Sequence, residues 1–199
     1  MEAIKIKNYT LIENADNRKK CKVVKDEAGN EIGFEISGVL TTFNVMNGNG
    51  QTFLPNSYDK WINEYFVKNK INVPLCVLHN DYDIRSLCGH VKNMETNENG
   101  VRMTCFVPKY TYYYNLIKNL IDGGQLQGFS NYGAAVKYDY TDNGIMVNEF
   151  QLINVAIVAT PSDVGGLDIE NTNFVGFDKK DSEKEKEKEK EKEGNVFIF

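Results

Sequence analysis

The stretch that most limits the fold of this chain runs from Gln125 to Tyr138, with the sequence QLQGFSNYGAAVKY. Its residues alternate at a period of two, the repeat of a β-strand, and the chain enters it from Gly123 and Gly124. One of its two rows is apolar except for one serine: Leu126, Gly128, Ser130, Tyr132, Ala134, Val136 and Tyr138. We therefore predict a strand whose Ser130 row faces the core, with Gly128 and Gly133 letting other groups approach the backbone. A serine there is either a small core residue with a satisfied hydroxyl or a nucleophile.

A second strand-like run, VPLCVLH from Val73 to His79, is apolar in one row until the histidine. An acidic turn from Asn80 to Asp83 follows at once. Histidine is well suited to take a proton from a serine hydroxyl near neutral pH, because its ordinary pKa is about 6.5. His79 is therefore the candidate general base. The chain's other histidine, His90, is expected to be a half-exposed strand residue.

A third run, EFQLINVAIVA from Glu149 to Ala159, is apolar in both rows from Leu152 onward except at Asn154. A strand buried on both faces has this pattern, and a buried amide needs hydrogen-bond partners. One hypothesis is that Asn154 orients His79 as the third member of a Ser-His-Asn constellation. The alternative is that Asn154 bonds a neighbouring backbone group, and the sequence leaves both open.

Length and charge limit the class of protein. The chain has 199 residues, a net charge of −5 and a pI near 5.2, and residues 1–175 are expected to form one mainly β, α+β domain. It shows no basic cluster interleaved with aromatic residues, no charged-then-apolar leader and no apolar run near 18 residues. We therefore expect neither nucleic acid nor a membrane as a partner.

The four cysteines show no CxxC spacing, and three of them lie in strand-like apolar runs. This pattern is typical of small hydrophobic residues in a reducing compartment. No metal site and no cofactor are expected.

Further elements follow from periodicity and turn residues. The additional predicted strands are Ala3–Ile12, Cys21–Val24, Phe34–Leu40, Leu87–Met94 and Val101–Val107, of which the first three suggest an antiparallel meander. One helix is predicted after a cap at Asn56 or Ser57, with an apolar stripe of Tyr58, Trp61, Ile62, Tyr65 and Phe66, and a second from about Lys109 to Asp122. Asn143-Gly144 predicts a β-hairpin.

Residues 176–199 differ in composition from the rest. Glutamate and lysine alternate from Glu183 to Glu193, which predicts a disordered, solvated linker, and the chain ends in the apolar residues Val196 to Phe199. This short tail is either an unremarkable chain end, a docking peptide for scaffold or shell, or a segment removed by self-cleavage.

In this order the motifs resemble the HK97-type prohead proteases of tailed phages, a family related in fold to the herpesvirus assemblins. The resemblance covers Phe34 to about Asp168 and is most specific in LHNDYDIRSLCGHV, LIDGGQLQGFSNYG and LINVAIVATPSDV. It implies a small, partly closed antiparallel β-barrel flanked by a few helices. It also implies a serine endopeptidase with Ser130 as nucleophile and His79 as general base.

Two positions depart from that family. Asn131 stands where an aliphatic residue usually follows the serine, and Asn154 stands where the family usually has an acidic residue, commonly glutamate. An amide can fix the tautomer of a histidine but cannot stabilise the imidazolium by charge. Either the enzyme is slow or the third role falls elsewhere, with Glu149 and His90 as the alternatives.

The resemblance further implies partners and a location. The substrates would be the capsid scaffold, the major capsid protein and the chain itself, inside the assembling procapsid in the host cytoplasm, and a homodimer is compatible with this function. Two other functions remain open. One is a non-catalytic β-barrel that serves as a structural or scaffold-binding component of the phage head. The other is a hydrolase that uses Cys105 or Cys76 near His79, although thiols in apolar surroundings are usually inert.

Overall fold

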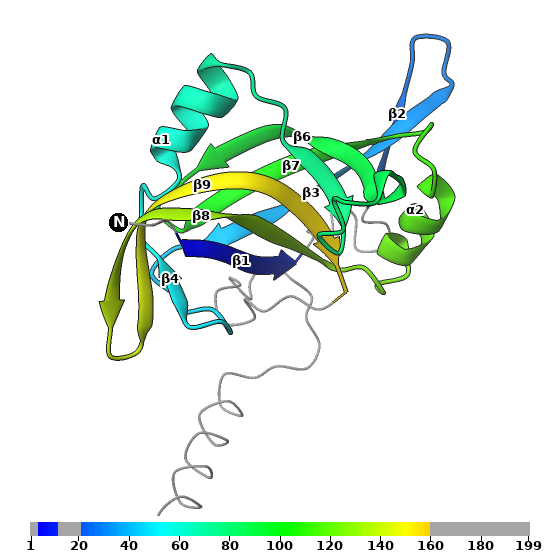
Figure 1. Ribbon diagram of the computed structural model, residues 1–199. Coiled ribbons are helices and arrows are strands. Elements are labelled where there is room, and N and C mark those ends of the chain that lie inside the picture. The colour runs from blue at the N-terminus through cyan, green and yellow to red at the C-terminus, as the bar shows by residue number, and fades with distance from the viewer. Residues whose placement is uncertain (1–3, 12–20, 160–199) are drawn as a thin grey trace, which may run out of the picture. The chain divides into compact units, whose positions relative to one another are not determined.

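The computed structural model describes residues 4–11 and 21–159, and side chains within 21–159 (Figure 1). Its nine strands form one sheet with the order β1-β8-β9-β5-β6-β7-β3-β2, and β4 pairs with β9 off this path. The strands are β1 (Ile4–Leu11), β2 (Lys22–Lys25), β3 (Glu31–Thr42), β4 (Gln51–Phe53), β5 (Pro74–Val77), β6 (Leu87–Thr96), β7 (Gly100–Pro108), β8 (Gly128–Thr141) and β9 (Gly144–Val158). The prediction of a mainly β chain is confirmed, as is the hairpin at Asn143-Gly144, which joins β8 to β9. The short strand β4 lies in a stretch for which no strand was predicted.

The helices are few and short. Helix α1 (Asp59–Trp61) continues as a π-helical segment (Ile62–Lys68), a 3₁₀ turn spans Ile84–Ser86, and α2 covers Tyr114–Asp122. Figure 1 shows α1 and α2 near opposite ends of the curved sheet. No helix among the described residues is long and apolar enough to cross a membrane.

The predicted helix starts need correction. The first helix has Tyr58 as its N-cap without a side-chain cap, and Asn56 instead adopts a left-handed turn conformation with φ 69°. The second helix begins five residues later than predicted, because turns that include a Thr111 Oγ1 hydrogen bond to the Cys88 carbonyl (2.9 Å) precede it. Its predicted end is confirmed, with Gly123 as C-cap.

The predicted small, partly closed antiparallel barrel is wrong in two respects. The sheet is mixed, because β4 and β5 both pair with β9 in parallel. The sheet is also open, because β1 and β2 are the two ends of the strand order. One edge of β3 pairs with β7 and the first part of its other edge pairs with β2, while β1 lies beside β3 without a ladder between them in the described part of the chain.

The two faces of β8 are the reverse of the prediction. The core row is Phe129, Asn131, Gly133 and Ala135, whereas Tyr132 and Ala134 in the Ser130 row are half-buried and Val136 is exposed. The bulky Phe129 ring and the close packing at Gly133 account for this orientation. A Cβ at Gly133 would lie 2.2 Å from the Gln151 carbonyl oxygen, so its predicted role in close approach is confirmed.

The Ser130 row therefore belongs to the outer face of the sheet. A small separate apolar cluster of Cys76, Ala156 and Val158 lies on this face, apart from the main core. Ser130 is directly opposite Ala156 in the β8–β9 ladder, and Ala156 is opposite Cys76 in the β9–β5 ladder. Ser130 is buried here beneath other side chains rather than in the main core.

On the core face, Asn131 is part of a fully buried polar network. Its Nδ2 donates to Thr41 Oγ1 (2.8 Å) and to Tyr58 OH (2.7 Å), and these two hydroxyls are 2.9 Å apart. The network links β8 to β3 and to the start of α1. Buried polar groups are costly without partners, so this network explains why an amide is tolerated at this core position.

We expect Asn131→Ala to lower the free energy of unfolding by about 2 kcal/mol, because two buried hydrogen bonds are lost. Urea unfolding followed by tryptophan fluorescence measures this. The matched control is Asn148→Ala, which removes an exposed hydrogen bond to Asp139 and should cost less than about 0.5 kcal/mol. Equal losses in the two variants would contradict the structural role of the network.

Candidate active site

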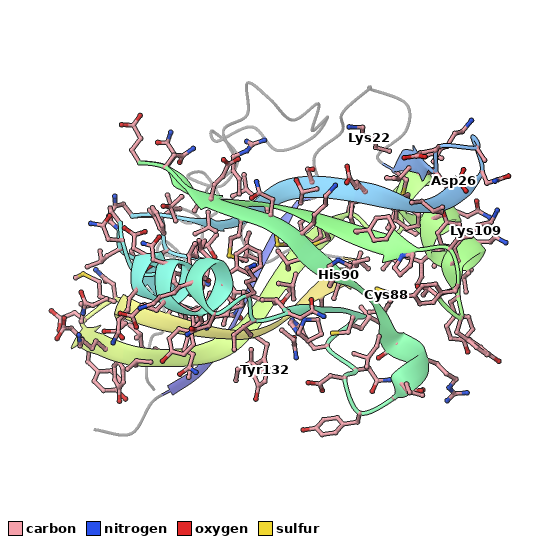
Figure 2. The ribbon with its side chains drawn as sticks, turned by 90° about the horizontal axis from the view of Figure 1, so that it is seen from above. Lys22, Asp26, Cys88, His90, Lys109 and Tyr132 are labelled. Atoms are coloured by element: carbon pink, nitrogen blue, oxygen red, sulfur yellow. The ribbon has the colours of Figure 1, made fainter. Side chains whose placement is uncertain are left out.

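Three adjacent strands bring Ser130, Asn154 and His79 together on the outer face of the sheet. β9 lies between β8 and β5, so its residue Asn154 lies between the strand of Ser130 and the strand that leads into His79. Asn154 is opposite Tyr132 in the β8–β9 ladder. The Tyr132 ring, labelled in Figure 2, packs edge-on against the His79 ring with 6.0 Å between ring centroids.

The three side chains form one hydrogen-bonded chain. His79 Nε2 bonds to Ser130 Oγ, and His79 Nδ1 lies 2.8 Å from Asn154 Oδ1. Ser130 and Asn154 are at most 1% exposed, and His79 is half-buried. This arrangement of hydroxyl, imidazole and a third oriented group is the geometry that activates a serine nucleophile.

His79 is held by a strained turn at the end of β5. Leu78 and His79 both adopt left-handed backbone conformations with φ 55°. Such conformations cost about 1–3 kcal/mol each for residues other than glycine and cluster at functional sites. A hydrogen bond from Leu78 N to the Ile157 carbonyl (3.0 Å) holds the turn against β9, and one from Asn80 N to the Val77 carbonyl (3.1 Å) closes the turn.

A fourth residue, Asp81, extends the chain of hydrogen bonds. Asn154 Nδ2 donates to Asp81 Oδ2 at 2.9 Å, while Asn154 Oδ1 faces His79. From sequence, Asp81 was only part of an acidic turn with no assigned role. The available signal was its position two residues after the candidate base, which keeps its carboxylate near the mouth of the same strand.

The structure does not bring the two alternative third members to His79. Glu149 Oε1 pairs with Lys60 Nζ (2.8 Å) and Glu149 Oε2 with Lys137 Nζ (2.6 Å), and hydrogen bonds to Lys137 and Lys60 lower the pKa of this carboxyl. His90 lies on β6, where its ring packs against Phe106 at 5.9 Å between centroids (Figure 2). Its predicted half-exposed strand position is confirmed.

All four cysteines are buried: Cys21, Cys76, Cys88 and Cys105. Burial raises the pKa of Cys88 to about 12 and raises that of Cys105 well above its ordinary value. Cys76 Sγ donates to the Val155 carbonyl (3.4 Å) beneath the site. These surroundings favour neutral thiols, which are poor nucleophiles.

Comparison with known proteins finds a likeness in fold but none in sequence family. No family model matches the chain and no curated protein matches its sequence. A capsid assembly protease of a bacteriophage, however, has a similar fold. The solved structure is that of the bacteriophage T4 capsid assembly protease, gp21, with a TM-score of 0.61 and 18% sequence identity over 81% of this chain and 100% of that chain. At this identity the likeness concerns the fold.

A fluorophosphonate reagent should label Ser130, because the bonded His79 can remove the hydroxyl proton as the oxygen attacks phosphorus. Peptide mass spectrometry locates the adduct. His79→Ala should lower the labelling rate by at least about 10². His90→Ala is the matched control and should react like the wild type. Labelling of another serine, or equal losses in the two histidine variants, would contradict the assignment.

The four thiols should be unreactive toward a disulfide reagent such as DTNB in the folded protein at pH 8. All four thiols are buried away from the reagent, and burial raises the pKa of Cys88 and of Cys105, so these two carry little thiolate at pH 8. The thiols should all react after unfolding in guanidinium chloride. A fast-reacting thiol in the folded protein would instead favour the cysteine hydrolase.

Proposed function

We propose that this chain is a serine endopeptidase that cleaves scaffold or major capsid protein, and itself, during maturation of a tailed-phage procapsid. The single observation that carries the proposal is the hydrogen-bonded chain from Ser130 through His79 to Asn154. The likeness in fold to a phage capsid assembly protease supports the choice of substrates. The sequence motifs that resemble the HK97-type prohead proteases support the same class.

The proposed reaction follows the geometry. Ser130 Oγ attacks the carbonyl carbon of the scissile peptide while His79 Nε2 takes its proton, and the same nitrogen then protonates the leaving amine. Water hydrolyses the acyl-enzyme with His79 again as the base. Asn154 accepts the Nδ1 hydrogen of His79 throughout, which keeps Nε2 facing the nucleophile.

The proposed place of action is the interior of the assembling procapsid in the host cell. A protease that cleaves scaffold and capsid subunits must meet them where they assemble, so these proteins would be both its partners and its substrates. The predicted linker and apolar tail at 176–199 lie outside the described residues, so the tail stays either a plain chain end, a docking peptide or a segment removed by self-cleavage. A homodimer remains a prediction.

Ser130→Ala should abolish cleavage when the chain is co-expressed with its capsid and scaffold proteins. Mass spectrometry of intact proteins should reveal fragments that only the wild type produces. Ser37→Ala is a matched control, because its hydroxyl bonds to Thr104 on neighbouring strands and should be dispensable for cleavage. If wild type and Ser130→Ala both leave every protein intact under assembly conditions, the non-catalytic head component becomes the better interpretation.

A further inference from the structure

We propose that Asp81 is a positioning residue for the site, one that orients the Asn154 amide and supplies the negative charge that an asparagine lacks. The proposal rests on the proposed serine mechanism and deepens it. Its basis is the continuous chain Ser130, His79, Asn154, Asp81, in which the last link is the 2.9 Å bond from Asn154 Nδ2 to Asp81 Oδ2.

An ionised carboxylate distinguishes the two ends of an amide. Carboxylate oxygens only accept hydrogen bonds, so Asp81 favours the orientation in which Asn154 presents its NH₂ group. The reversed amide would place Oδ1 against the carboxylate, with two acceptors facing each other. Asp81 thereby directs Asn154 Oδ1 toward His79.

The amide orientation in turn selects the histidine tautomer. Asn154 Oδ1 can only accept, so His79 Nδ1 must carry the hydrogen. Nε2 then has its lone pair directed at the Ser130 hydroxyl, as a general base requires. When asparagine replaces the acid of a serine protease triad without such control, the wrong tautomer costs about 10⁴ in kcat.

Asp81 also places a charge near the imidazolium that forms in the reaction. Among the described neighbours, Asp83 is paired with Arg85 (2.7 Å), the Tyr132 ring on β8 packs against His79, and the Cys76 thiol on β5 lies near the Asn154 amide oxygen. Asp81 is therefore the carboxylate linked to His79, through one amide. Because Asp81 is exposed, its charge is partly screened, and its orienting effect should exceed its Coulombic effect.

The test measures the second-order rate at which a fluorophosphonate labels Ser130, which requires no knowledge of the natural substrate. In that reaction the Oγ–P bond forms, the P–F bond breaks, fluoride leaves and His79 holds the serine proton. Asp81→Ala removes the acceptor and should slow labelling by about tenfold or more, up to the 10⁴ of a wrong tautomer. Asp81→Asn keeps an acceptor oxygen but loses the charge, so its labelling rate should fall less than that of Asp81→Ala.

The pH dependence separates charge from mere packing. Removal of a nearby negative charge destabilises the imidazolium, so the rising limb of the rate profile should move to lower pH in Asp81→Asn. The matched control is Asp83→Asn, which removes the same charge from the same loop without touching Asn154 and should leave the limb in place. Urea unfolding of each variant verifies that it is folded.

A double variant that exchanges the carboxylate and the amide between positions 81 and 154 tests the contact between them. In the double variant Asp81→Asn with Asn154→Asp, the carboxylate contacts His79 directly and the new amide can donate to it. This variant should label about tenfold faster than Asp81→Asn alone, because the negative charge is restored next to the imidazole. It should also label faster than Asn154→Asp alone, in which two carboxylates face each other at positions 81 and 154; without a contact between these positions the double variant would be no faster than Asn154→Asp.

The outcomes are distinguishable. Wild-type rates and unshifted pH profiles in both Asp81 variants, or a double variant no faster than Asn154→Asp alone, would overturn the role of Asp81 while leaving the serine mechanism in place. If the wild type itself shows no labelling at Ser130, the proposed function fails and the role of Asp81 falls with it.

Discussion

The ladders that β9 forms with its neighbours are the interaction on which the rest of the structure depends. β9 pairs antiparallel with β8 through the hairpin at Gly144 and parallel with β5, and it also holds the short strand β4. Because backbone hydrogen bonds keep neighbouring strands about 4.8 Å apart, side chains from β8, β9 and the end of β5 can reach one another. The chain of contacts from Ser130 to His79 and Asn154 is a direct consequence of that strand order.

Successive residues of β8 point to opposite faces of the sheet, so this strand contributes both to the core and to the candidate site. Asn131 points into the core, where it bonds Thr41 and Tyr58, and its neighbour Ser130 points to the outer face, where it bonds His79. A register slip by one residue would exchange these two environments, turning Ser130 into the core and Asn131 to the outer face. The internal network and the packing of Phe129 thus hold the site in register.

Much of the site could be predicted from sequence because each of its members interrupts an apolar strand pattern. Ser130, His79 and Asn154 are polar residues within or at the end of such runs, and polar groups in those places require partners. The facing of β8 was predicted wrongly, since both of its rows hold small and apolar residues and periodicity does not say which row meets the core. The π-helical continuation of α1 and the parallel pairing of β5 with β9 also depend on contacts between distant segments.

Four features follow from the amino-acid sequence alone: the strand-rich class, the hairpin between β8 and β9, the end of α2 at Gly123 and the short list of polar residues that could form a site. Local rules suffice for these features because turn chemistry and alternation act over a few residues. Only the tertiary structure decided that the sheet stays open, that Glu149 pairs with two lysines instead of His79, and that Asp81 meets Asn154. These contacts join residues far apart in the chain, and strand order and register, rather than local propensity, determine which of them meet.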